Sequence, residues 1–162
     1  MNTMKVLGID PGYGRCGLAI LEGDGSHPRL TYSTCVETKS TDEFSRRLLE
    51  VGDAIVQTIL KHKPELIALE ELYFSNNQKT ALNVAEARGM ILYIAAKHNI
   101  PLREFNPMTV KVAITGYGRA NKTDVTKMIE RLVHIETPLQ YDDEYDAIAV
   151  GITALAHARN PI

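Results

Sequence analysis

Four acidic residues stand at positions where their carboxylates can meet. Asp10 ends a short apolar run, 4–10, and Glu70 ends another, 66–70. In open α/β sheets, ligands collect at the carboxyl ends of the strands. Asp143 and Asp146 are three residues apart at the start of the last predicted helix, on the apolar face that must turn towards the sheet. We therefore expect these four carboxylates to converge at one edge of the sheet.

Converging carboxylates of this kind call for a positive counter-charge. They repel one another and raise their own pKa values, and a divalent cation relieves that repulsion. All-oxygen ligands suit Mg²⁺ or Mn²⁺ rather than Zn²⁺, and the five histidines and two cysteines lack metal-ligand spacing. Two such ions about 4 Å apart clamp the attacking water and the leaving oxygen of a phosphoryl displacement. The pattern favours a two-metal phosphotransfer site.

A basic segment, residues 103–131, is the second chemical feature. It carries six Lys or Arg and three Asp or Glu on a chain of net charge −2. Lys111 and Lys122 lie in it, and Lys122 closes a glycine-rich loop, Gly116-x-Gly118-x-x-x-Lys122. Such lysines can meet phosphate or stabilise developing negative charge. A basic segment on a mildly acidic body is compatible with a nuclease but does not establish one.

The hydrophobic pattern predicts the elements that position these residues. Period-two and continuous apolar runs predict strands, and apolar residues at helical spacing predict helices, the first opened by a capping box at 40–43. The predicted strands are 4–10, 17–21, 30–38, 66–70 and 100–105. The predicted helices are 44–62, a long one ending near 98, one capped by Asn121, and one starting near Asp142. A meander followed by strand–helix–strand crossovers predicts an α/β fold, with one five-stranded mixed sheet flanked by helices.

Length and composition limit the class of protein. The chain has 162 residues, 44% hydrophobic and 23% charged, which predicts one domain spanning 1–162. No apolar run approaches the roughly 20 residues that span a bilayer, so we expect no membrane association. The N-terminus enters a strand without a signal peptide, and the two cysteines suit reduced thiols. We therefore expect a cytoplasmic protein.

Five motifs together resemble the RuvC family of crossover junction endodeoxyribonucleases. They are Gly8-Ile9-Asp10-Pro11-Gly12, Ala68-Leu69-Glu70, Ala85-Glu86-Ala87-Arg88-Gly89, Gly116-x-Gly118-x-x-x-Lys122 and Asp143-x-x-Asp146-Ala147. The similarity runs from about residue 4 to 158. It implies a ribonuclease H-like fold and a homodimer that resolves four-way (Holliday) DNA junctions by paired symmetric nicks, in homologous recombination and DNA repair. It also implies two Mg²⁺ per subunit, with Mn²⁺ as a substitute, and a branch-migration complex such as RuvAB as a partner.

The resemblance also implies roles for particular residues. The four catalytic, metal-binding carboxylates of the family fall on Asp10, Glu70, Asp143 and Asp146. Its basic active-site residues fall on Lys111 and Lys122, with Lys122 catalytic as well as DNA-binding. Arg119, in the same basic loop, is a further DNA-binding candidate.

Two of these assignments leave alternatives open. Asp142 precedes Asp143, and its i, i+4 spacing from Asp146 would also share a face, although the register favours Asp143. A family aromatic that stacks on a junction base matches Tyr73, and Phe74 beside it could serve instead.

Three other classes of protein share part of the pattern. An actin-like ATPase or sugar kinase has the same opening strand but needs a second such domain, and the Gly-x-Asp-x-Gly motif is not repeated here. A YqgF-like protein or a ribonuclease H would cut other nucleic acid structures. A junction-binding protein without chemistry is disfavoured because all four carboxylates are present.

Overall fold

The structure is a computed structural model that describes residues 3–72 and 78–158. Strands come first along the chain and helices dominate its second half. The strands are β1 (Met4–Asp10), β2 (Arg15–Gly23), β3 (Arg29–Glu37), β4 (Leu66–Glu70) and β5 (Leu102–Phe105). The helices are α1 (Phe44–His62), α2 (Gln78–Lys97), α3 (Pro107–Thr115), α4 (Lys122–Leu132) and α5 (Asp142–His157).

The strands form one mixed sheet in the order β3-β2-β1-β4-β5. β1, β2 and β3 make an antiparallel meander, whereas β4 and β5 run parallel to β1. The crossovers through α1 and α2 create these parallel pairs, because a parallel strand can be reached only by a long connection. The predicted five-stranded mixed α/β sheet is confirmed.

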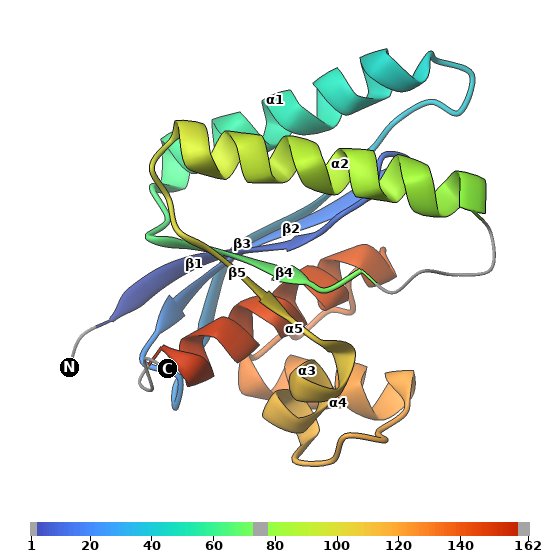
Figure 1. Cartoon of the computed structure of the whole chain (residues 1–162). Coiled ribbons are helices and arrows are strands. Elements are labelled where there is room, and N and C mark those ends of the chain that lie inside the picture. The colour runs from blue at the N-terminus through green and yellow to red at the C-terminus, as the bar shows by residue number, and fades with distance from the viewer. Residues whose placement is uncertain (1–2, 73–77, 159–162) are drawn as a thin grey trace.

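Helices cover both faces of the sheet (Figure 1). α1 and α2 pack on one face, over a core that includes Leu7, Ile9 and Ile67. α5 lies against the other face, with α3 and α4 beyond it, over a core that includes Val6 and Ala68. Alternate residues of β1 and β4 therefore enter opposite cores, and both strands read as continuous apolar runs because both faces are buried.

Two local predictions about the helices were wrong or incomplete. α1 begins at Phe44 with Glu43 at its N-cap and no side-chain capping hydrogen bond, so the capping box predicted at 40–43 does not form. α3 was not predicted, because nine residues with apolar side chains on several sides show no clear helical period. Its start nevertheless carries a recognisable signal: Asn106 caps it, accepting a hydrogen bond of 2.8 Å from the Thr109 N–H, and Pro107 follows directly.

Across 3–72 and 78–158, no helix is both long enough and apolar enough to cross a membrane.

Candidate active site

The site is built at the carboxyl end of two neighbouring parallel strands. Asp10 is the last residue of β1 and Glu70 the last residue of β4, and the register pairs Ile9 with Leu69. The two acidic residues therefore end their strands side by side. The residues just before each are fully buried, so the sheet holds both carboxyl groups at the rim of the core.

α5 brings the other two acidic residues to the same rim. Its first turn lies directly on β2, where Gly17 pairs with Asp10 across the β1–β2 ladder. A Cβ on Gly17 would collide with the carbonyl oxygen of Asp143, and one on Gly8 would collide with that of Ala147. Only glycine therefore allows the helix to approach this closely, and that approach delivers Asp143 and Asp146 to Asp10.

Hydrogen bonds from buried polar side chains fix the start of α5. Glu144 is buried and accepts a 2.7 Å hydrogen bond from the hydroxyl of Ser33 on β3. The Tyr145 hydroxyl donates to Glu130 of α4 over 2.7 Å and accepts from the backbone N–H of Leu139 over 3.0 Å. The two residues between Asp143 and Asp146 are thus tied to β3 and α4, which restricts how far the carboxylates can move.

The electrostatics show that the acidic residues crowd one another. The pKa of Asp10 is raised from 3.8 to about 8, chiefly by burial and then by repulsion from the nearby carboxylates of Asp146, Asp143 and Glu70. Burial, followed by repulsion from Asp146, raises the pKa of Glu70, and Lys111 acts in the opposite direction. Burial also raises the pKa of Asp146, opposed by Lys122. The cluster is therefore short of positive charge.

A pocket of about 370 Å³ opens over this cluster. Its lining combines three of the acidic residues with both predicted lysines and several residues of α3, α4 and their connection. The lining residues are Asp10, Glu70, Asp146, Pro107, Val110, Lys111, Ala120, Asn121, Lys122, Val125 and Ala149. Acidic floor and basic wall suit a phosphodiester that must be bound and cut at one place.

Asp142 and Asp143, the two candidates for the third carboxylate, have different surroundings. The Asp142 side chain is 72% exposed, and its Oδ2 lies 3.0 Å from the Lys122 ammonium. The Asp143 side chain is 25% exposed, and its carboxyl group is within hydrogen-bonding reach of Asp10. The geometry favours Asp143, which is beside Asp10, over Asp142, which is exposed and paired with Lys122.

The remaining DNA-binding candidates are Arg119, Tyr73 and Phe74. Arg119 is exposed and does not line the pocket, although the loop that carries it adjoins the pocket wall. Tyr73 and Phe74 lie outside the described residues. Sequence reasoning did not single out Asn121 as a pocket residue; its position as the N-cap of α4 places it there.

The acidic residues offer the ligand atoms that a hard divalent cation needs, but they do not yet surround a common point. Among the described residues, no three His, Cys, Asp or Glu side chains already stand close enough together to hold a metal ion. Carboxylate oxygens are nevertheless the ligands that Mg²⁺ and Mn²⁺ prefer. The raised pKa values of Asp10, Glu70 and Asp146 show that a bound cation would stabilise their charged forms.

The sheet order and the carboxylate-lined pocket define a ribonuclease H-like α/β domain, and comparisons with known proteins narrow the class. The family model "Crossover junction endodeoxyribonuclease RuvC" matches residues 6–154. The chain belongs to this family.

Relatives with the same description match almost end to end. The relative from Petrotoga mobilis is 42% identical over 95% of this chain and 93% of its own. The relative from Brachyspira hyodysenteriae is 42% identical over 98% and 97%. The solved structure "T. thermophilus RuvC in complex with Holliday junction substrate" has 29% identity and a TM-score of 0.91, covering 96% of this chain and 95% of the other.

Proposed function

We propose that this chain is a structure-specific endonuclease that resolves four-way DNA junctions by paired symmetric nicks, in recombination and DNA repair. One observation carries the proposal: half-buried, mutually repelling acidic residues line a pocket together with Lys111 and Lys122. Its family relatives bear the name of that activity, and one solved relative is described in complex with a Holliday junction. We further propose that residues 1–162 act as one nuclease domain in the cytoplasm.

The pocket residues divide the work of phosphodiester hydrolysis. Two Mg²⁺ ions, for which Mn²⁺ would substitute, held by Asp10, Glu70, Asp143 and Asp146, would supply Lewis-acid charge and an activated water. Lys122 reaches into the pocket from α4, with its Nζ 3.9 Å from Oδ2 of Asp146, and is placed to stabilise charge on the scissile phosphate.

The DNA would be guided to the pocket by the surrounding basic segment. Lys111 lines the pocket from α3, and Arg119 stands exposed on the adjoining loop. Both would contact the phosphate backbone, which makes junction binding sensitive to salt. Tyr73 or Phe74 would stack on an unpaired base.

We propose a homodimer that joins two such sites. Leu82 and Tyr93 on α2 are 61% and 63% exposed, and Gly89 lies between them on the same stripe with open space where a Cβ would be. An apolar groove of about 590 Å³ runs beside this stripe between α1 and α2. A second copy packed here would cover the apolar side chains, and its two-fold symmetry would suit a junction. A branch-migration complex such as RuvAB is the further partner that we propose.

The test is cleavage of a labelled synthetic four-way junction beside a linear duplex and an RNA–DNA hybrid of the same sequence. We expect paired symmetric nicks in the junction alone, dependent on Mg²⁺ and lost in Asp10→Asn while junction binding persists. Equal cutting of the hybrid or the duplex would show that the chain has another nuclease activity of the same fold, not junction resolution. Sedimentation checks the dimer: a single species of monomer mass at micromolar concentration would contradict it.

A further inference from the structure

Arg15 is a basic residue next to the acidic cluster that the pocket does not include. It is the first residue of β2, and its side chain is 51% exposed. Its Nη1 lies 3.8 Å from Oδ2 of Asp143, and Arg15 is not among the residues that line the pocket. Asp143 thus stands between Asp10, which repels it when both are charged, and Arg15, which attracts it.

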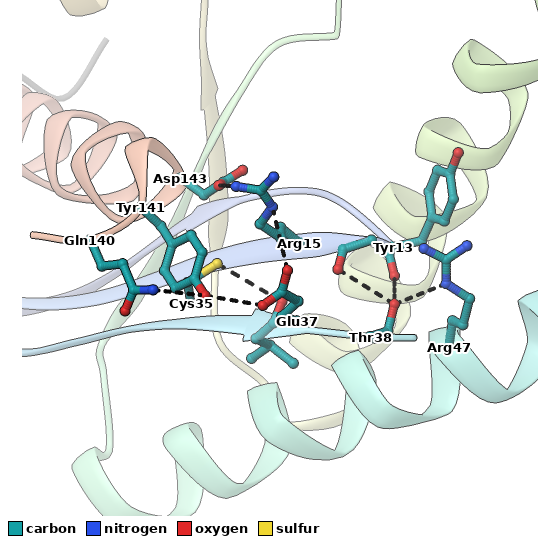
Figure 2. A network of polar contacts seen from close by, with 11 residues as sticks. Tyr13, Arg15, Cys35, Glu37, Thr38, Arg47, Gln140, Tyr141 and Asp143 are labelled. Carbon is teal, nitrogen blue, oxygen red and sulfur yellow. Dashed lines mark hydrogen bonds and ion pairs between the residues drawn. The ribbon is translucent and has the colours of Figure 1, made fainter. Parts of the chain in front are cut away.

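The guanidinium group of Arg15 is itself held by neighbours on two other elements (Figure 2). Its Nε lies 4.0 Å from Oε1 of Glu37, the residue that pairs with it across the β2–β3 ladder. Its Cζ lies 5.4 Å from the centroid of the Tyr141 ring, at the N-cap of α5. The Tyr141 hydroxyl donates a 3.0 Å hydrogen bond to Oε2 of Glu37, which joins the two supports to each other.

The turn from which Arg15 projects is also fixed. The Thr38 hydroxyl donates to the carbonyl oxygen of Tyr13 over 2.5 Å, and the Thr38 N–H donates to that of Gly14 over 2.9 Å. Arg47 of α1 donates in turn to the Thr38 hydroxyl over 2.9 Å. Figure 2 shows this second group of contacts beside the first. The backbone and the head of Arg15 are therefore both restrained, which allows it to restrain another side chain.

We propose that Arg15 is a positioning residue that holds Asp143 beside Asp10 in the orientation needed for metal binding and cleavage. Lys122 contacts Asp142 and Asp146 in a similar way, with its Nζ 3.0 and 3.9 Å from their carboxylate oxygens. Partners that orient a carboxylate without touching the ion tune both metal affinity and rate. The inference rests on the proposed function, because it assigns Arg15 to the same site.

A rival role follows from the exposure of Arg15. A half-exposed guanidinium near a nuclease pocket could bind a DNA phosphate directly, and the two roles predict different measurements. A phosphate contact adds affinity for the junction in the absence of metal. A positioning contact changes the rate at saturating junction and the affinity for the ion, while junction affinity stays the same.

The experiment compares Arg15→Ala and Arg15→Lys with wild type and with Arg29→Ala. Arg29 is the matched control, because it pairs with Glu22 at the opposite end of the β2–β3 ladder. Three quantities are measured: the single-turnover cleavage rate at saturating junction, the junction dissociation constant in EDTA, and Mn²⁺ binding to DNA-free protein by calorimetry. Thermal unfolding of each variant in EDTA shows that it is folded.

For Arg15→Ala, we expect the cleavage rate to fall and the Mn²⁺ dissociation constant to rise, each by about 3- to 10-fold, the low end for a partly exposed partner. The junction dissociation constant should stay within about twofold of wild type. Arg15→Lys should fall between the alanine variant and wild type, because it keeps the charge but loses the planar fork. Arg29→Ala should match wild type.

Several results would overturn the inference. Weaker junction binding with an unchanged saturated rate would make Arg15 a phosphate contact. Unchanged or tighter Mn²⁺ binding in Arg15→Ala would show that it does not orient the ligand, and an equal loss in Arg29→Ala would reveal a general effect of losing a surface ion pair. If wild type cut no junction, the proposed function would fail, yet the Mn²⁺ comparison would still decide the role of Arg15.

Discussion

Replacing Asp10 with asparagine should stabilise the metal-free protein while it abolishes cleavage. The carboxyl group of Asp10 is buried beside three other acidic residues, which raises its pKa from 3.8 to about 8. Asparagine has nearly the same shape and no charge, so it removes the repulsion and leaves the packing intact. An acidic residue that opposes folding is expected where several carboxylates lie close together without a positive charge between them.

The sign and size of the effect follow from proton linkage. Well below pH 3.8, Asp10 is protonated whether the chain is folded or unfolded, so it costs no stability. As pH rises towards 8, the unfolded chain loses this proton and the folded chain keeps it, because the folded-state pKa is the higher one, and folding becomes less favourable. At about 1.4 kcal/mol per tenfold, a pKa raised from 3.8 to about 8 sets a ceiling of about 6 kcal/mol. We expect about 2–3 kcal/mol at pH 8.5, because water and side-chain movement relieve part of the repulsion.

The assay is urea unfolding in EDTA at pH 5.5 and pH 8.5, for wild type, Asp10→Asn and the control Asp53→Asn. Asp53 is exposed on α1, which packs on the face of the sheet opposite to α5. The gain of Asp10→Asn over wild type should grow between the two pH values, and millimolar Mg²⁺ should shrink it by stabilising wild type alone. An asparagine variant less stable than wild type at pH 8.5, or a gain that does not depend on pH, would refute the reasoning.

Three further changes test other parts of the structure. Lys122→Ala should slow cleavage at saturating junction by about 10- to 100-fold with little change in binding, and an unchanged rate would remove this lysine from the site; Lys127→Ala, exposed on the same helix, is the control. Gly17→Ala should displace the start of α5 from the sheet, lower the free energy of unfolding by about 1–3 kcal/mol and remove most of the cleavage activity. A fully active variant would contradict the close approach of α5 to β2. Arg88→Ala breaks the paired hydrogen bonds of 2.5 and 2.6 Å to Glu104 that tie α2 to β5. It should lower the free energy of unfolding by about 1 kcal/mol; calorimetry that finds no change would show the pair to be neutral.

The sheet and the acidic residues could be predicted because their signals are local. β1 and β4 are buried on both faces, so they read as unbroken apolar runs, and each ends in an acidic residue. The meander and crossovers then follow from connection lengths. Asp143 and Asp146 could be paired with the strand-end acids because the apolar stripe of α5 defines which face must meet the sheet.

The features that escaped prediction depend on contacts between distant parts of the chain. Arg15 acquires its role only through the register with Glu37 and the approach of Tyr141, and neither neighbour can be found from the residues around it. The capping box at 40–43 matched a local pattern, but the chain between Thr38 and Phe44 continues into a turn before α1 begins. Short segments with competing local signals are decided by tertiary contacts.

The most direct test of the account is to locate bound metal, by growing crystals of the protein with Mn²⁺ and calculating an anomalous difference map. We expect peaks within about 2.5 Å of carboxylate oxygens of Asp10, Glu70 and Asp146, with Asp143 turned towards them. The contrary result is Mn²⁺ bound only at another acidic surface, such as that of Glu50 on α1 and Asp42 just before this helix. That result would contradict the claim that the half-buried acidic cluster is a metal-dependent nuclease site.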